Sequence, residues 1–151
     1  ARIVLHGVSM GAATVLMASG EDLPGNVKAV IADCGYTSEW DEFRREADAL
    51  HIPWFPVLNA TSVLSKIRDG YDFKQASALA QVKKSRIPTL FIHGSSDELV
   101  PYSMLGELYA AAACEKEELT VEGAGHALSS SVAPTLYWRT VEDFIAKYLD
   151  R

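Results

Sequence analysis

The feature that most constrains the fold of this chain is its opening segment, where an apolar run leads directly into a Gly-x-Ser-x-Gly motif. Residues 2–6 favour a β-strand, Gly7 to Gly11 surround Ser9, and residues 12–18 favour a helix. This order of strand, sharp turn and helix is typical of a nucleophile elbow. Such a turn is so tight that the positions flanking the serine require small residues, which Gly7 and Gly11 provide. The segment therefore predicts a turn that holds the Ser9 hydroxyl beside a helix N-terminus, where backbone N–H groups favour negative charge.

Strand-like and helix-like segments alternate along the rest of the chain. Four short apolar runs predict buried strands, at residues 2–6, Val27–Asp33, 89–93 and 118–122. The first three runs are continuous rather than alternating, as expected for parallel strands with helices on both faces. Helices are predicted at Met10–Ser19, 102–113 and Pro134–Leu149. The predicted fold class is therefore α/β, with a mostly parallel sheet and flanking helices.

The interval between the second and third predicted strands is too long for a simple crossover. Residues 38–50 predict a helix capped by Ser38, and a Pro-bounded aromatic stretch follows at residues 52–56. Residues 57–68 predict a second helix, which ends at Gly70. We therefore predict a single domain over residues 1–151, in which residues 36–80 form a small helical cap.

Charge and cysteine content argue against several classes of partner. The formal net charge is −6, whereas a nucleic-acid partner requires clustered Lys and Arg. Cys34 and Cys114 are too few and too far apart for a disulfide framework or a metal motif, so we expect neither a metal nor another cofactor. No signal peptide is visible. The compartment therefore stays open between the bacterial cytoplasm and a membrane-anchored or extracytoplasmic location, if an anchor precedes these residues.

Two further motifs follow predicted strands. His93-Gly-Ser-Ser-Asp97, continuing to Val100-Pro101, follows the third strand, and Gly-Ala-Gly-His126 follows the fourth. With the Ser9 motif, the chain resembles the C-terminal half of an α/β-hydrolase-fold serine hydrolase, whose chain order is also Ser, Asp, His. Within that fold it is similar to the serine aminopeptidase and prolyl-oligopeptidase-like branches and to bacterial hydrolases related to them.

The resemblance implies a catalytic triad. Ser9 would be the nucleophile, His126 the general base and acid, and Asp97 the carboxylate that orients the imidazole. The backbone N–H of Met10 would be one oxyanion-hole donor. Because some members of the family carry the acid after the preceding strand, Asp33 is the alternative acid, and Glu98 is a weaker one.

Other side chains have structural as well as functional interpretations. His6 and His93 each precede a glycine at a strand end, which favours packed, hydrogen-bonded residues over catalysis. The aromatic residues of the cap region suit either an acyl pocket or packing within the cap; they are Tyr36, Trp40, Trp54 and Phe55.

The implied reaction is cleavage of an ester, thioester or amide of a small-molecule acyl substrate through an acyl-enzyme, with a carboxylesterase as the most specific interpretation. Peptidases and acyltransferases use the same triad, and a non-catalytic binding module of the same fold is the alternative from another class.

The resemblance also implies that part of the fold lies outside these residues. In the family, strands precede the elbow, and the loop after the third strand supplies a second oxyanion N–H. Since the loss of one oxyanion donor costs about 10²–10³ in turnover, we expect these residues alone to be weakly active. Without neighbouring strands, residues 2–6 form an exposed apolar edge. We expect this edge to pair with the missing N-terminal half of the fold or with another copy of the chain.

Overall fold

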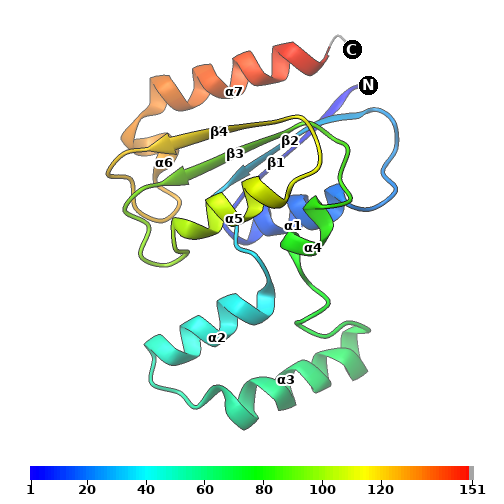
Figure 1. Cartoon of the computed structure of the whole chain (residues 1–151), viewed down its shortest axis with the longest axis vertical. Coiled ribbons are helices and arrows are strands. Elements are labelled where there is room, and N and C mark those ends of the chain that lie inside the picture. Colours follow the sequence, from blue (N-terminus) through cyan, green and yellow to red (C-terminus); the bar gives the residue numbers. More distant parts are fainter. Residues whose placement is uncertain (150–151) are drawn as a thin grey trace.

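Four parallel strands form the centre of the structure, a computed structural model in which residues 1–149 are described (Figure 1). The sheet has the strand order β1-β2-β3-β4, and each strand pairs in parallel with the next. The strands are β1 (Ile3–Val8), β2 (Val27–Asp33), β3 (Thr89–Gly94) and β4 (Lys116–Val121). The predicted α/β class with a parallel sheet is confirmed.

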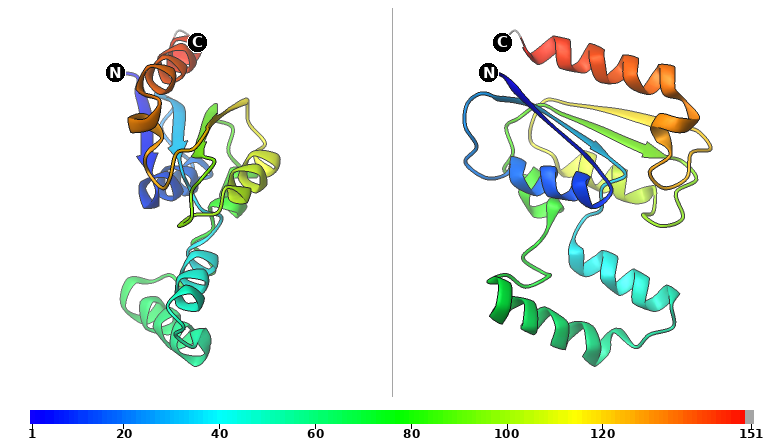
Figure 2. Two further views of the ribbon diagram at one scale, coloured as in Figure 1. Left: turned by 90° about the vertical axis from the view of Figure 1, so that its left-hand side faces the viewer. Right: turned by 180° about the vertical axis from the view of Figure 1, so that it is seen from behind.

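The two faces of the sheet are covered by different helices. Side chains alternate along β2, so Val30 and Ala32 pack on one face, whereas Ala29 and Ile31 pack on the other. The first face is covered by α1 (Met10–Ser19), α4 (Ala78–Val82) and α5 (Ser103–Ala111), and the second by α7 (Pro134–Leu149). Figure 2 shows α7 on the opposite side of the sheet from these three helices. The continuous apolar run of β2 thus reflects burial on both faces.

The cap region consists of two helices that lie away from the sheet (Figure 1). Helix α2 spans Glu39–Ala49 and helix α3 spans Trp54–Asp69. The predicted cap at Ser38 is confirmed, because its Oγ accepts the N–H of Asp41 at 3.1 Å. Gly70 ends α3 with φ of 86°, in the left-handed conformation that glycine adopts without strain. The assignment of residues 36–80 as a cap insertion stays a prediction.

Several element boundaries differ from those predicted. Helix α3 begins at Trp54 rather than residue 57, with a non-helical residue at Phe55. Helix α5 is shorter than the predicted 102–113 helix. β1 continues to Val8, and β4 begins at Lys116 rather than residue 118. β4 can include charged residues at its start because it lies at an edge of the sheet.

The opposite edge of the sheet is β1, which pairs only with β2 among residues 1–149. The expectation that this edge pairs with further strands or with a second copy stays a prediction.

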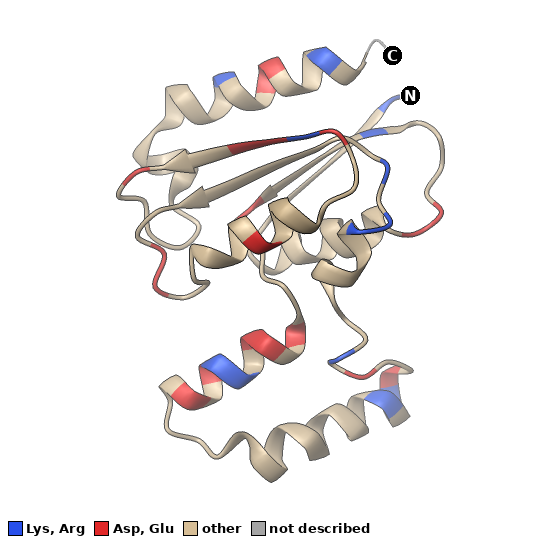
Figure 3. Cartoon of the chain, viewed as in Figure 1, with Lys and Arg blue, Asp and Glu red and all other residues tan. Residues whose placement is uncertain are grey.

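Lys and Arg are distributed over several elements rather than gathered on one (Figure 3). Within the described part of the chain, none of the helices is both long and apolar enough to span a bilayer.

The two glycines of the Gly-x-Ser-x-Gly motif give a matched test of the elbow. A Cβ at Gly7 would overlap the carbonyl of Gly11, whereas a Cβ at Gly11 meets no heavy atom within 4 Å. The expectation that the turn itself requires both glycines is therefore wrong for Gly11. We expect Gly7→Ala to lower the free energy of unfolding by about 1–3 kcal/mol through overpacking. Gly11→Ala, inside α1, should be neutral or stabilise by about 0.5–1 kcal/mol. Urea denaturation measures both, and equal effects of the two substitutions would contradict this account.

Candidate active site

Ser9 lies in a strained turn between β1 and α1. Its backbone has φ of 55° and ψ of −117°, a conformation that costs about 1–3 kcal/mol for a residue other than glycine. Two hydrogen bonds hold it there: the Ser9 N–H donates to the carbonyl of Asp33 at 2.8 Å, and the Ser9 carbonyl accepts the N–H of Ala13 at 3.0 Å. The end of β2 and the first turn of α1 together therefore fix the direction of the serine.

Asp97 lies in the loop between β3 and α5, and its carboxylate is fully engaged. The Oδ1 atom accepts the backbone N–H groups of Leu99 and Val100 at 3.0 and 2.9 Å. The Oδ2 atom lies 2.9 Å from Nδ1 of His126 and 3.2 Å from Nε2 of His93. His93 is only 1% exposed, and its Nε2 also donates to the carbonyl of Val100 at 3.0 Å. The expectation of a packed, hydrogen-bonded His93 is confirmed.

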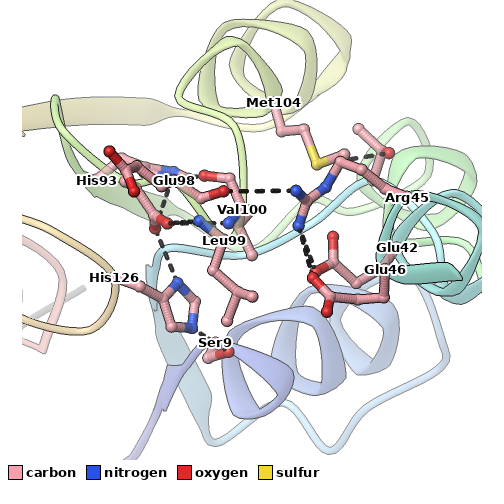
Figure 4. Close-up of polar contacts among 12 residues, drawn as sticks. Ser9, Glu42, Arg45, Glu46, His93, Glu98, Leu99, Val100, Met104 and His126 are labelled. Carbon is pink, nitrogen blue, oxygen red and sulfur yellow. Dashed lines mark hydrogen bonds and ion pairs between the residues drawn. The ribbon is translucent and has the colours of Figure 1, made fainter. Parts of the chain in front are cut away.

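His126 joins Asp97 to Ser9 (Figure 4). Its Nδ1 lies 2.9 Å from Oδ2 of Asp97, and its Nε2 lies 2.8 Å from Oγ of Ser9. An ionised carboxylate only accepts hydrogen bonds, so Nδ1 carries the proton and Nε2 is left to accept from the serine hydroxyl. The structure thus brings Ser9, His126 and Asp97 into one hydrogen-bonded chain.

The close approach of two loops supports this geometry. A Cβ at Gly94, the last residue of β3, would overlap the carbonyl of Ala124, two residues before His126. The Ser96 N–H also donates to the Ala124 carbonyl at 3.0 Å. Glycine at the end of β3 therefore allows the loops of Asp97 and His126 to lie in contact.

Met10 is the first residue of α1. N–H groups in the first turn of a helix have no acceptor within that helix, so its backbone is suited to an incoming anion. Its role as an oxyanion-hole donor stays a prediction.

Asp33, the alternative acid, lies in a different environment. It is 1% exposed, and its Oδ1 accepts the hydroxyl of Ser129, in α6 (Ser129–Val132), at 3.0 Å. The Tyr137 hydroxyl also bonds to Asp33 and lies 2.9 Å from Nε2 of His6. Burial raises the pKa of Asp33, and partial desolvation of the imidazole lowers the pKa of His6. The carboxylate in contact with His126 is that of Asp97.

His6 is hydrogen-bonded as expected but lies at the surface. Glu98, the weaker alternative acid, contributes its backbone carbonyl, which accepts Nη1 of Arg45 at 3.5 Å.

Helix α2 brings charged residues close to the site, which the sequence did not indicate. Nη2 of Arg45 donates to Oε1 of Glu42 at 3.0 Å and to Oε1 of Glu46 at 3.2 Å. Burial raises the pKa of Glu42, and the nearby charges of Arg45 and His126 oppose that shift. Figure 4 shows Leu99 between this group and Ser9. No motif marks these residues, because their proximity to His126 arises only from the placement of α2.

The four aromatic residues suggested for a substrate pocket do not share one cavity. Tyr36 packs with Ala13, Val100 and Met104 beneath the loops of the site. Trp54 lines an apolar cavity of about 300 Å³ between α2 and α3. Trp40 lines a separate cavity and lies under Nζ of Lys74, 4.4 Å from its ring centroid. Phe55 is 65% exposed. Trp40 and Trp54 therefore lie against other residues of the cap.

Comparison with known proteins agrees with this fold. The chain is 33% identical over 146 residues to the uncharacterized protein YqkD of Bacillus subtilis, covering 95% of this chain and 47% of YqkD. It superposes on the esterase domain of a Rhodothermus marinus protein with a TM-score of 0.67 and 21% identity, covering 97% of this chain and 60% of that one. It superposes on an acylaminoacyl peptidase of Pyrococcus horikoshii with a TM-score of 0.68 and 17% identity, covering 96% of this chain and 23% of that one.

The parallel sheet and its structural neighbours define an α/β-hydrolase fold, of which this chain corresponds to the C-terminal part. The model of the prolyl oligopeptidase family matches residues 1–151, and the chain belongs to that family. The chain spans about half the length of YqkD.

The raised pKa of Asp33 predicts a pH-dependent effect of its substitution. As the pH rises, Asp33 loses its proton in the unfolded chain at a lower pH than in the folded chain. Between these two pKa values ionisation favours the unfolded chain, so the free energy of unfolding of the wild type falls as the pH rises. In Asp33→Asn that loss is absent. The free energy of unfolding of Asp33→Asn relative to the wild type should therefore increase as the pH rises above about 4, measured by urea denaturation. The exposed Asp22→Asn is the control, and a pH-independent difference for Asp33→Asn would contradict the prediction.

Proposed function

We propose that this chain carries the catalytic residues of a serine hydrolase that cleaves an ester, thioester or amide bond through an acyl-enzyme on Ser9. One observation carries the proposal: Nε2 of His126 lies 2.8 Å from Oγ of Ser9 while its Nδ1 lies 2.9 Å from Oδ2 of Asp97. A serine hydroxyl is a weak nucleophile until an adjacent base removes its proton. These two contacts support His126 as that base and Asp97 as the carboxylate that orients it.

The reaction follows from these contacts. Oγ of Ser9 attacks the acyl carbon as its proton passes to Nε2 of His126, and Asp97 stabilises the imidazolium that forms. The imidazolium then protonates the leaving alcohol, thiol or amine as the bond to the acyl carbon breaks. Water, deprotonated by the same imidazole, attacks the acyl-enzyme, and the proton returns to Oγ as the acid is released. His126 thus acts first as base and then as acid in each half of the cycle.

The negative charge of the tetrahedral intermediate requires donors near Ser9. The N–H of Met10 and the N-terminus of α1 supply one such position. In the family a second donor comes from a loop that precedes the elbow, and this chain spans less than half of YqkD. We therefore expect weaker catalysis from residues 1–151 than from a protein that includes that loop.

A carboxylesterase acting on small or medium acyl groups is the activity that we favour. Fold neighbours include an esterase domain and an acylaminoacyl peptidase, and the fold alone does not select between esters and amides.

A fluorophosphonate probe tests the nucleophile directly, in the longest form of the protein that contains these residues. We expect covalent labelling of the wild type and its loss in Ser9→Ala, because the probe reacts with an activated serine hydroxyl. Ser65→Ala, at a half-buried position in α3 where the hydroxyl donates to the carbonyl of Tyr71 rather than to a histidine, should label as the wild type does. Well-folded wild type that takes up no probe would instead support a non-catalytic binding module.

Measurement of ester turnover distinguishes the two acids. Asp97→Asn should reduce ester turnover by about 10⁴, as expected when the residue that orients the triad histidine loses its charge. Asp33→Asn keeps an acceptor for Ser129 and should change turnover far less. Loss of turnover in Asp33→Asn alone would overturn the assignment of Asp97. If turnover of peptide substrates exceeds that of esters, the peptidase alternative replaces the esterase.

A further inference from the structure

Cys34 lies directly behind the proposed triad. It follows the last residue of β2, adopts φ of 48°, and is 1% exposed. Its Sγ, a carboxylate oxygen of Asp97 and a ring nitrogen of His126 all lie within 4.8 Å of one another. Three different ligand atoms, one from each of three loops, thus lie close together.

The Cys34 sulfur also lies close to other parts of the site. The backbone N–H groups of Ala127 and Ser9 are near enough to Sγ to oppose the upward shift of the Cys34 pKa. The thiol therefore lies beside the turn that holds the serine and the loop that holds the histidine. A ligand bound at Sγ would therefore alter the hydrogen bonds that join Ser9, His126 and Asp97.

The donor set has a definite chemistry. A thiolate, an imidazole nitrogen and a carboxylate oxygen are the ligands that Zn²⁺ prefers, at about 2.3, 2.0 and 2.1 Å from the metal. In a tetrahedral site such ligand atoms lie about 3.6 Å apart. The three side chains therefore need to move only slightly toward one another to bind one metal ion. We propose that Cys34, Asp97 and His126 form an inhibitory site for a thiophilic divalent cation of the zinc class.

Inhibition follows from the proton balance, and this part rests on the proposed hydrolase function. The metal takes the Nδ1 lone pair, so the single proton of the neutral imidazole moves to Nε2. The Cys34 thiol releases its proton to solvent as the sulfur–metal bond forms. An Nε2 that already carries a proton does not accept the proton of Ser9, and the nucleophile is no longer activated.

Two features set the strength and the route of binding. Burial, with the charge of Asp33, raises the pKa of Cys34 to about 12, so metal binding must displace a tightly held proton. The His126 side chain, 20% exposed, is the part of the cluster that reaches solvent. A cation therefore enters past the imidazole, and water supplies the remaining ligand position.

Cobalt(II) tests the site without reference to activity. Titration of the purified chain with Co²⁺ should produce a thiolate-to-cobalt charge-transfer absorption that saturates at one metal per chain. The band should be lost in Cys34→Ser and retained in the matched variant Cys114→Ser. Absence of the band in folded wild type, or its persistence in Cys34→Ser, would overturn the site. If circular dichroism shows that Cys34→Ser is unfolded, Cys34→Ala is used in its place.

Fluorophosphonate labelling then tests inhibition. Saturating Zn²⁺ should slow labelling of the wild type at least tenfold relative to its own rate without metal, and should have less than a twofold effect on Cys34→Ser. Cobalt binding at Cys34 with undiminished labelling under Zn²⁺ would overturn the inhibitory role. A protein that shows the cobalt band but never labels would contradict the hydrolase function and leave the metal site standing.

Discussion

The parallel pairing of the four strands is the constraint on which the rest of this structure depends. Val8 pairs with Asp33, Asp33 with Ile92, and Gly94 with Val121. Because every strand points the same way, these pairs place all the carboxyl ends at one edge of the sheet. The loops that leave that edge carry Ser9, Asp97 and His126, and Ser9 and His126 are 117 positions apart in the chain. A hydrogen bond over that separation exists only because the sheet assembles.

The surroundings of two buried carboxylates separate their roles. Asp97 accepts two backbone N–H groups and lies against the imidazoles of His93 and His126. Asp33 instead accepts hydroxyl groups from α6 and α7. One carboxylate is thereby aimed at the solvent-accessible histidine, whereas the other ties β2 to the helices on its far side. Buried polar groups require such partners, and the identity of the partner decides what each acid can do.

The cap region is coupled to the site through few contacts. Arg45 links α2 to the Glu98 carbonyl, one residue after Asp97, while pairing with Glu42. An apolar cavity beside this helix is lined instead by another of its faces, with Phe43, Ala47 and Leu50. The polar side of α2 thus faces the acid loop, and its apolar side packs toward α3.

Much of the fold and the three candidate catalytic residues could be predicted from local patterns. Continuous apolar runs indicated buried parallel strands, and β2, α1 and α7 have the predicted bounds. Glycine spacing indicated the turn at Ser9, whose positive φ is a local property of the chain. Short elements escaped prediction: α4 and α6 have five and four residues, too few to show a helical period.

The sequence by itself determined the fold class, the succession of strands along the chain and the residue types at each strand end, because apolar periodicity and turn chemistry act over a few neighbouring positions. Only the tertiary structure decided that Asp97 is the acid in contact with His126. It also decided that His93 lies against Asp97 and that Ser129 donates to Asp33. The position of Cys34 behind the triad likewise comes from the tertiary structure. The tertiary structure also separated the cap aromatics that looked alike in sequence. The physical reason is that these contacts join distant loops, whose geometry depends on strand register and helix placement rather than on any local pattern.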